Sequence, residues 1–424
     1  SHHRQAKQVG NVMNSIFATR PHVWYHALPM AAEKNFEKQL ITGDYPALEA
    51  VFQRTVADLG QDDPLRPLIV LVPSHLLGLH LSRTLAARGI AHINTRFMTL
   101  GDFAESITIP TLRAGKTAVP ALAREALVGD IVSGLKAKNF YFGAIADKSG
   151  FHEAILRTID DLKRACIKPE TLGKVCGSAA VRSACHPGKL RDILKVWNAY
   201  ESRMLELGWY DKADGDEMAL ESVPQSGLIA GAAAILLYGF YDLAEMPRRI
   251  VKACSDVNSI IALVPFEDRR SFDFSRPVID WFRAEGFSEA VENAERTTAL
   301  GDLADRIFNP DGPIAGIEKS LEIISAPGEV REVREIVRLI SREILEEGVA
   351  PHEIAVLTRR SHPYTGLFRD LLEAMGVMPY VLEGIDLTDT RPGKSLCLLL
   401  EILRHNFSRA AVIEFATYAR LRAA

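Results

Sequence analysis

The segment Leu68-Ile69-Val70-Leu71-Val72, which lies between two prolines, decides the fold class. A short apolar run rich in β-branched residues and bounded by turn residues is typical of a buried parallel strand. Ser74 then stands where a helix N-cap is expected, and residues 75–87 predict a helix that ends before Gly89. Residues 90–97 predict a second short strand. The stretch therefore predicts a β–α–β unit and an α/β fold.

The same pattern stops and later returns. From about residue 118 to 225 the periodicity indicates helices only, broken by short polar segments. Residues 234–238 then predict a strand, a helix follows from about Met246, and residues 259–264 predict another strand. We therefore expect a helical domain inserted into one α/β domain, with the strands near Val70 and Leu236 in a single sheet.

The flanking regions carry two further patterns. Between about residues 30 and 60, apolar residues such as Phe36 and Leu40 recur at roughly helical spacing, which predicts a helical lead-in. From residue 321 onward a second α/β unit is predicted, with strands at 321–325, 353–357 and 379–382 and helices at 330–347 and 364–375. The expected domains are a helical lead-in at 1–60, a first α/β domain at 61–115 and 228–310, an inserted helical domain at 116–227, a second α/β domain at 318–390 and the start of a further helical insertion at 391–424.

Length and composition limit the class of protein. The 424 residues exceed one ordinary domain, and 47% hydrophobic with 25% charged residues is the balance of a globular protein rather than a disordered or fibrous one. The net charge of −4 provides no global basic field, so any nucleic-acid contact must come from a local patch. No apolar run is long enough for a membrane helix and no signal-peptide pattern opens the chain. We expect a cytoplasmic protein without a membrane partner.

The cysteines argue against a metal or disulfide framework. There are five, with no C-x-x-C pair, which does not fit a zinc ribbon or a secreted disulfide scaffold. Cys166, Cys176 and Cys185 follow one another at intervals of about ten residues, but no His or Cys stands at ligand spacing beside any of them. We predict no metal site in this chain.

A phosphate-binding loop is not evident either. Such a loop needs G-x-x-x-x-G-K-[ST] directly after a strand, so that backbone N–H groups and the lysine surround the phosphates. The chain has one Gly-Lys-Thr, Gly115-Lys116-Thr117, where Pro110 stands in place of the first glycine. The tripeptide follows a helix-like segment rather than a strand, so it predicts a loop before a helix.

Three segments carry a resemblance to a known family. They are residues 69–74 with 95–104, then Tyr200-Glu201 with 208–211 and 237–243, and then 325–333 with 354–360 and 376–380. Their text resembles the B subunit of AddAB-type ATP-dependent nucleases, also called RexB, which is related to the superfamily-one helicases. The resemblance implies two RecA-like domains, the first carrying the helical insertion.

The second segment bears on ATP hydrolysis. In active helicases of this superfamily the matching strand end carries an Asp that holds Mg²⁺ and a Glu that orients the attacking water. The resemblance puts Tyr238 and Gly239 at these two positions, and neither can perform those roles. Asp242 remains, although an isolated acid after a strand is more often a helix cap. These are the degenerate ATPase positions, and we expect no catalytic residue and no cofactor in this chain.

Candidate DNA contacts come from predicted strand ends, where open α/β sheets bind ligands. The candidates are Ser74, Thr95, Arg96, Arg359 and Arg360. The resemblance implies that single-stranded DNA crosses the cleft between the two α/β domains near them. Ser74 has an alternative role as a helix N-cap. Arg359 and Arg360 suit an ion pair with an acidic neighbour as well as a DNA phosphate.

The resemblance implies a helicase-like DNA-binding and scaffold subunit that processes DNA ends in double-strand-break repair. Its partner would be an active helicase–nuclease motor subunit. The family's nuclease domain, with an iron–sulfur cluster and Mg²⁺, would lie outside this chain. Two alternatives stay open: an autonomous ATP-dependent DNA helicase, and a protein-interaction module that does not bind DNA.

Overall fold

A computed structural model describes residues 36–419, apart from 136–139, 176–184, 269, 295–320, 382–383 and 385. The chain divides into two compact units, Ser1–Ala315 and Gly316–Ala424, and each is considered by itself. Among the described residues, none of the helices is long and apolar enough to cross a lipid bilayer.

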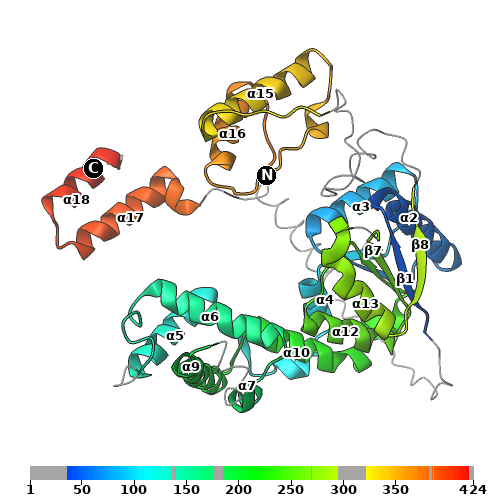
Figure 1. Cartoon of the computed structure of the whole chain (residues 1–424), viewed down its shortest axis with the longest axis horizontal. Helices are drawn as coiled ribbons and strands as arrows, with labels where there is room; N and C mark the ends of the chain where they lie inside the picture. Colours follow the sequence, from blue (N-terminus) through cyan, green and yellow to red (C-terminus); the bar gives the residue numbers. More distant parts are fainter. Residues whose placement is uncertain are drawn as a thin grey trace, which may run out of the picture. The chain divides into compact units, whose positions relative to one another are not determined.

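A six-stranded sheet forms the centre of the first unit (Figure 1). Its strands are β1 (Lys38–Gly43), β2 (Leu68–Leu71), β3 (Thr95–Met98), β6 (Ile235–Tyr238), β7 (Ile260–Pro265) and β8 (Ser288–Glu292), in the order β3-β2-β6-β7-β1-β8. Every pairing is parallel. All strands therefore present their carboxyl ends at one edge, which we call the carboxyl edge.

Helices cover both faces of this sheet, which explains why β2, β6 and β7 consist entirely of buried residues. One face packs against α2 (Tyr45–Asp62) and α3 (His75–Ala87), through side chains such as Phe52 and Leu81. The other face packs against α4 (Leu100–Ile107), α10 (Lys212–Ser222), α12 (Glu245–Ser255) and α13 (Arg276–Ala284). Figure 1 shows α2 and α3 on the opposite side of the strands from α12 and α13.

Several predicted elements are confirmed. The strands β2, β6 and β7 and the helices α3 and α12 lie where the apolar patterns place them. Ile69 lies opposite Ile235, so β2 and β6 are direct neighbours although the insertion separates them in sequence. The expected single sheet is thus present, and the α/β class of the first unit is confirmed.

The expected helical lead-in at residues 1–60 is wrong for residues 38–43, which form β1 between β7 and β8. Phe36 and Leu40 are four residues apart, but Leu40 belongs to a strand, because a short apolar run fits either structure. Gly43 ends this strand. A Cβ there would lie 1.7 Å from the carbonyl oxygen of Glu292, so the close approach of β8 requires glycine.

The inserted region contains α5 (Ala121–Leu135), α6 (Ser149–Arg164), α7 (Pro169–Val175) and α9 (Pro187–Glu206), followed by α10. Trp197, Tyr200, Val128 and Ile159 lie at the centre of its own core. The prediction of helices only is wrong here. Two short parallel strands, β4 (Thr117–Ala118) and β5 (Trp209–Tyr210), pair beside the helices. Two-residue strands carry too little periodicity to be seen in a sequence.

The first unit contains four shorter helical elements as well. The 3₁₀ turn η1 (Pro110–Arg113) precedes β4, and η2 (Val223–Gln225) and α11 (Gly227–Gly231) lead from α10 into β6. The 3₁₀ turn η3 (Arg270–Ser275) leads into α13. The elements η2 and α11 thus connect the inserted region back to the sheet, and η3 with α13 connects β7 to β8.

The second unit is helical in its described residues. It contains α15 (Glu329–Leu345), η4 (Pro351–Glu353), α16 (Tyr364–Ala374), η5 (Leu387–Asp389), α17 (Arg391–Arg404) and α18 (Arg409–Tyr418). Val333, Val337 and Ile340 of α15 pack against Phe368 and Leu372 of α16, as the apolar face predicts.

The predicted strands of this second unit are not found in its described part. Residues 321–325 and 354–357 and the described residues of 379–382 are irregular. A strand requires neighbours that accept its hydrogen bonds and cover its side chains. Ile323 is 81%, Leu357 94% and Tyr380 85% exposed. The expectation of a second α/β domain at 318–390 is therefore wrong for the residues described.

Candidate functional site

The carboxyl edge of the six-stranded sheet is the natural place to look for a ligand site, because open parallel sheets bind ligands there. Asp44 follows β1, Ser74 comes shortly after β2, Thr99 follows β3, and Gly239 follows β6. Each of these positions lies at or near the start of a helix or loop whose backbone N–H groups are the available donors. The partners of these N–H groups decide what the edge can bind.

The N-terminus of α2 is closed by its own carboxylate. Asp44 alone connects β1 to α2, and its Oδ1 accepts a hydrogen bond from the Ala47 N–H at 2.8 Å. Its Oδ2 accepts a second one from the Ala294 N–H at 3.1 Å, and the residue is only 7% exposed. Pro46 removes a further donor from the first turn. A phosphate would meet an anion here rather than a ring of free N–H groups.

The next two helices are capped in the same way. The Ser74 Oγ accepts a hydrogen bond from the Leu77 N–H at 3.3 Å, so its role as the N-cap of α3 is confirmed. Thr99 and Asp102 form a reciprocal capping box at α4. The hydrogen bonds from Thr99, and His75 at 3.6 Å, hold the pKa of Asp102 below its usual range. The three helix starts after β1, β2 and β3 thus use their own side chains as caps.

The end of β6 carries no ligand for a metal. Tyr238 is buried, and its ring meets that of Phe52 edge to face at 5.4 Å between centroids. Burial, with Glu49 nearby, raises the pKa of the Tyr238 hydroxyl, which therefore stays protonated and neutral. Gly239 has φ +79°, and a Cβ there would lie 3.2 Å from the Leu77 Cδ2. Local backbone and packing thus disfavour an acid at either position.

Asp242 is exposed and does not cap α12, whose N-cap is Ala244. The cap role considered for Asp242 is therefore wrong. Its carboxylate lies in the loop after β6 without a hydrogen bond to the start of the helix.

Gly115-Lys116-Thr117 is not the start of a helix. Gly115, with φ +75°, and Lys116 lie between η1 and β4, and Thr117 is the first residue of β4. The Thr117 N–H donates to the Gly208 carbonyl at 2.8 Å, as part of the pairing with β5. The first helix after it, α5, begins at Ala121. Its backbone donors are therefore committed to a turn and a strand, and not arranged around an anion.

Thr95 and Arg96 are not at the carboxyl edge. Thr95 lies opposite Leu68, where β2 and β3 begin, and Arg96 lies opposite Ile69 with an exposed side chain. Both were expected to share the strand-end site with Ser74, and this expectation is wrong. The apolar run was taken to begin at residue 90, whereas β3 begins only at Thr95, which places Thr95 at the opposite end of the strand from Thr99.

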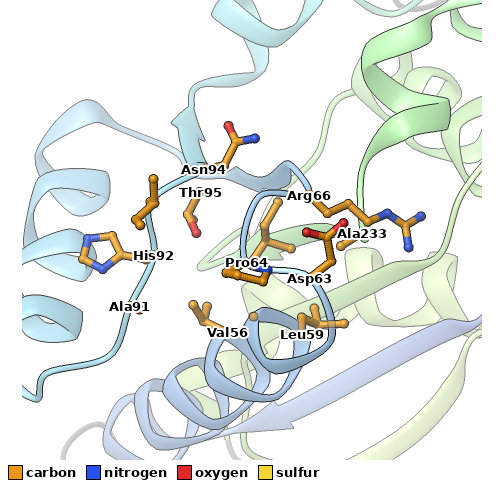
Figure 2. Close-up of a pocket in the computed structure, with 13 residues that line it drawn as sticks. Val56, Leu59, Asp63, Pro64, Arg66, Ala91, His92, Asn94, Thr95 and Ala233 are labelled. Carbon is orange, nitrogen blue, oxygen red and sulfur yellow. The ribbon is translucent and has the colours of Figure 1, made fainter.

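Thr95 instead lines a small pocket at the amino edge of the sheet, together with Asp63, Arg66, His92 and Asn94 (Figure 2). Its polar groups are already engaged with the protein. The Arg66 Nη2 donates to the Ala232 carbonyl at 2.8 Å, and the Asn94 Nδ2 donates to the Leu65 carbonyl at 2.7 Å. The pocket has a volume of about 30 Å³, which leaves room for no more than a few waters. The hydrogen bonds around the pocket link neighbouring loops to one another, so we do not regard it as a ligand site.

Arg359 and Arg360 belong to the second unit and are exposed. They follow an irregular segment rather than a strand, so the expected strand end is not there. Within the described part of the chain, no carboxylate oxygen lies within 4 Å of the guanidinium of Arg359 or of Arg360, which is the limit for an ion pair. The ion-pair alternative therefore finds no support among these residues.

A buried charge network in the insertion was missed by sequence reasoning. The Lys163 Nζ of α6 lies 2.8 Å from the Asp211 Oδ2, 2.8 Å from the Asp214 Oδ1 and 3.1 Å from the Glu201 Oε1. The Tyr200 hydroxyl donates to the Asp211 Oδ2 at 3.2 Å. Burial alone would lower the pKa of Lys163, but these carboxylates raise it above its usual range. Lys163 thus stays charged and cannot act as a base.

This network anchors the start of α10. Asp211 is the N-cap of α10, accepting from the Ala213 and Asp214 N–H groups, and α10 packs on α4 and α12 beside the sheet. Lys163 lies 48 residues before Asp211, so no local spacing could signal the contact. Tyr200 and Asp211 both belong to the second segment that resembles the family, but the sequence did not predict a contact between them.

No group of three or more potential metal ligands occurs among the described residues. Cys166, Cys185, Cys254 and Cys397 are free thiols in different parts of the chain. Cys176 falls outside the described residues.

Comparison with known proteins agrees with the family resemblance of the three sequence segments. The chain is 25% identical over 276 residues to a protein of Carboxydothermus hydrogenoformans, covering 63% of this chain and 24% of that protein. It is 20% identical over 347 residues to one of Bacillus subtilis, covering 75% and 29% respectively. A Bacillus pumilus protein is 22% identical over 375 residues, with coverage of 81% and 31%. All three are named as the B subunit of an ATP-dependent helicase/deoxyribonuclease.

The chain spans about a quarter to a third of the length of these curated relatives. A family model described as "ADDB, N-terminal" matches residues 49–278, which is more than half of the chain. This matched region begins inside α2 and ends inside α13, so it contains the insertion and strands β2, β3, β6 and β7. The chain therefore belongs to the ADDB, N-terminal family.

Proposed function

We propose that this chain is the helicase-like part of a subunit that binds DNA and supports a partner motor subunit in processing double-strand breaks, and that it has no working ATPase site. The names of its relatives, each the B subunit of an ATP-dependent helicase/deoxyribonuclease, support the kind of complex. The role of this chain within that complex is DNA binding and scaffolding. RecA-like character for the first α/β domain, which the insertion splits, is part of the same proposal.

One observation carries the proposal: the N-terminus of α2 is occupied by the Asp44 carboxylate at the position where a phosphate loop would follow β1. Hydrolysis of ATP also requires carboxylates for Mg²⁺ and for the attacking water. The β6 end offers Tyr238 and Gly239 in their place. These residues do not fit ATP and Mg²⁺.

The DNA-binding part of the proposal is supported by Arg359 and Arg360. Two adjacent exposed guanidinium groups without a carboxylate partner among the described residues are free to contact phosphates. Ser74 is a secondary candidate, because its side chain is exposed beside the α3 N-terminus that it caps. Thr95 and Arg96 lie at the start of β3, at the opposite edge of the sheet from Ser74, so they do not form a joint site with it.

A salt titration of single-stranded DNA binding tests this part. We expect the logarithm of the affinity to fall linearly with the logarithm of salt concentration. Replacing Arg359 and Arg360 together by Ala should weaken binding to all sequences alike and flatten the slope by about one unit per lost phosphate contact. Fluorescence anisotropy with an unstructured oligonucleotide measures both quantities.

Arg338→Ala is the matched control, since Arg338 lies in the same unit but already pairs with Glu335 at 2.6 Å. It should leave affinity and slope unchanged. Equal effects of the control and of the double variant would refute specific contacts by Arg359 and Arg360. Absence of any binding by the wild-type chain would favour the alternative of a protein-interaction module.

A further inference from the structure

The inserted helices and the sheet have separate apolar cores. Trp197 and Tyr200 lie in the core of the insertion, whereas two other clusters cover the two faces of the sheet. Helix α10 belongs to the sheet, because its Ala219 packs into the sheet core. Two cores that meet through a small polar interface are expected to move relative to one another. The contacts between insertion and sheet therefore decide how firmly the insertion is held.

The two chain connections between the sheet and the insertion run side by side. The chain enters the insertion through β4 and leaves it through β5, and these strands pair, with the Val119 N–H donating to the Tyr210 carbonyl at 3.0 Å. Both residues of β4 are exposed. We call this pair of strands the β4–β5 ribbon. A domain attached at one place can rotate about it, whereas two distant attachments would oppose such a rotation.

Two glycines precede the strands of the ribbon. Gly115 has φ +75° and Gly208 has φ +63°, values that L side chains rarely adopt. A Cβ on Gly208 would lie 3.0 Å from the Gly115 carbonyl oxygen, so the two glycines are in close contact. Hinges consist of a few residues at element ends that absorb changes in φ and ψ. These glycines meet that description at the point where both connections cross.

A cluster of charges joins the insertion to the sheet next to this ribbon. Lys163, near the end of α6, belongs to the insertion, while Asp211 and Asp214, at the start of α10, lie on the sheet side of β5. The Lys163 Nζ lies 2.8 Å from the Asp211 Oδ2 and 2.8 Å from the Asp214 Oδ1. A weaker contact, between exposed side chains of Lys168 and Glu217 at 4.0 Å, lies on the same side. The position of the insertion thus depends on ion pairs that cross from α6 to α10.

Ion pairs of this kind specify a position without fixing it permanently. The Lys163 side chain is 10% and the Asp211 side chain 1% exposed. A buried ion pair roughly recovers the hydration that its two charges have lost, so its net contribution to stability is small. Rotation of the insertion would separate the charges and admit water, which would offset most of the lost attraction. Cys166 adds an apolar contact with the sheet core, but a thiol buries little area.

We propose that the inserted helices turn as one body about the β4–β5 ribbon, and that the ion cluster of Lys163, Asp211 and Asp214 holds them in the observed position. Opening separates Lys163 from the two aspartates and hydrates all three groups. The inserted helices keep their own core in both positions. This hinge is separate from the residues assigned above to DNA or nucleotide chemistry, so it stands whether or not the chain binds DNA.

Single-molecule energy transfer in the full chain measures the position of the insertion. Fluorophores are attached through noncanonical amino acids at Ala154, which is exposed on α6, and at Ala87, which is exposed at the end of α3. We expect one dominant transfer efficiency without further changes. Lys163→Met leaves the buried aspartates without their cation, and opening hydrates them. The share of molecules with the original efficiency should therefore fall at least about twofold, and a second population should appear.

Two further variants make the result specific. Arg203→Ala is the control, because its pair with Glu206 at 2.7 Å lies wholly within the insertion, and it should leave the distribution unchanged. Asp214→Asn is the milder variant. It removes one charge of the cluster but keeps an oxygen that can accept from the Asp211 N–H, so it should give a smaller second population.

Circular dichroism and the melting temperature separate motion from loss of structure. Lys163→Met with native helix content and a second population supports the hinge, and Asp214→Asn decides the matter if Lys163→Met does not fold. A lower melting temperature with an unchanged transfer distribution would show that the cluster only stabilises the fold, and would overturn the proposal. A broad distribution in the chain without these substitutions, or an equal effect of Arg203→Ala, would overturn it as well.

Discussion

At the scale of single residues, Lys163 is a buried cation that three carboxylates share. Its side chain is 10% exposed and that of Asp211 is 1% exposed, and the network around them joins α6, α9 and the start of α10. Removing one partner of a buried ion pair leaves the other charge unpaired in a region of low dielectric constant. Loss of Lys163 therefore leaves the cap residue of α10 with a poorly compensated buried charge.

We predict that Lys163→Met lowers the free energy of unfolding by about 3 kcal/mol, because Asp211, Asp214 and Glu201 lose their common cation. Urea denaturation followed by circular dichroism measures the change. Arg157→Ala on the same helix removes an exposed pair with Glu153 and should cost at most about 0.5 kcal/mol. Equal losses in both variants would show that the network has no special role.

Gly239 provides a second test at this scale. In Gly239→Ala, a Cβ at φ +79° is strained and lies 3.2 Å from Leu77, so the free energy of unfolding should fall by about 1–2 kcal/mol or more. Gly134→Ala is the control, because Gly134 lies in α5 with open space around it and should be neutral or slightly stabilising. Thermal denaturation distinguishes the two. A neutral Gly239→Ala would mean that an acid could be accommodated after β6.

At the scale of elements, the connection from β1 to α2 decides what the carboxyl edge can bind. We predict that Asp44→Ala destabilises the protein by about 1–2 kcal/mol, since the Ala47 and Ala294 N–H groups both lose their acceptor. Asp44→Asn keeps one accepting oxygen for the Ala47 N–H but turns an NH₂ group toward the Ala294 N–H, so it should recover only part of the loss. A loss of similar size in Asn and Ala would show that the charge, and not the cap, stabilises this end of α2.

The sequence predicts those elements that combine a clear period with sufficient length. The helices α3, α12, α15 and α16 and the buried strands β2, β6 and β7 meet this condition, and their positions are confirmed. Strand β1 is missed because Leu40 fits a helical repeat as well as a strand. The segment 353–357 has the composition of a strand, but its Leu357 is exposed and no neighbouring strand is described. Composition alone does not supply the partner that a strand needs.

The candidate site was predicted with the same limits. The cap at Ser74 could be derived from local sequence, since caps are local features, whereas the roles considered for Tyr238 and Gly239 at the end of β6 came from the family resemblance. Thr95 was assigned to the wrong edge because the start of β3 was placed five residues too early. The Lys163 network depends on contacts between distant segments, which one sequence does not display.

At the scale of the whole molecule, the chain combines membership of the ADDB, N-terminal family with a carboxyl edge closed by its own side chains. Its relatives are named for ATP-dependent activity, and they are three to four times as long as the part that matches. We infer that ATP-driven work in such a complex is done elsewhere than at the sheet described here.

The most direct measurement is a titration of the chain with a fluorescent ATP analogue in the presence of Mg²⁺, combined with a phosphate-release assay. We predict no saturable binding up to millimolar nucleotide and no turnover above buffer, because Asp44 fills the helix start and the end of β6 carries Tyr238 and Gly239 where carboxylates are needed. Saturable micromolar binding with phosphate release would contradict the account.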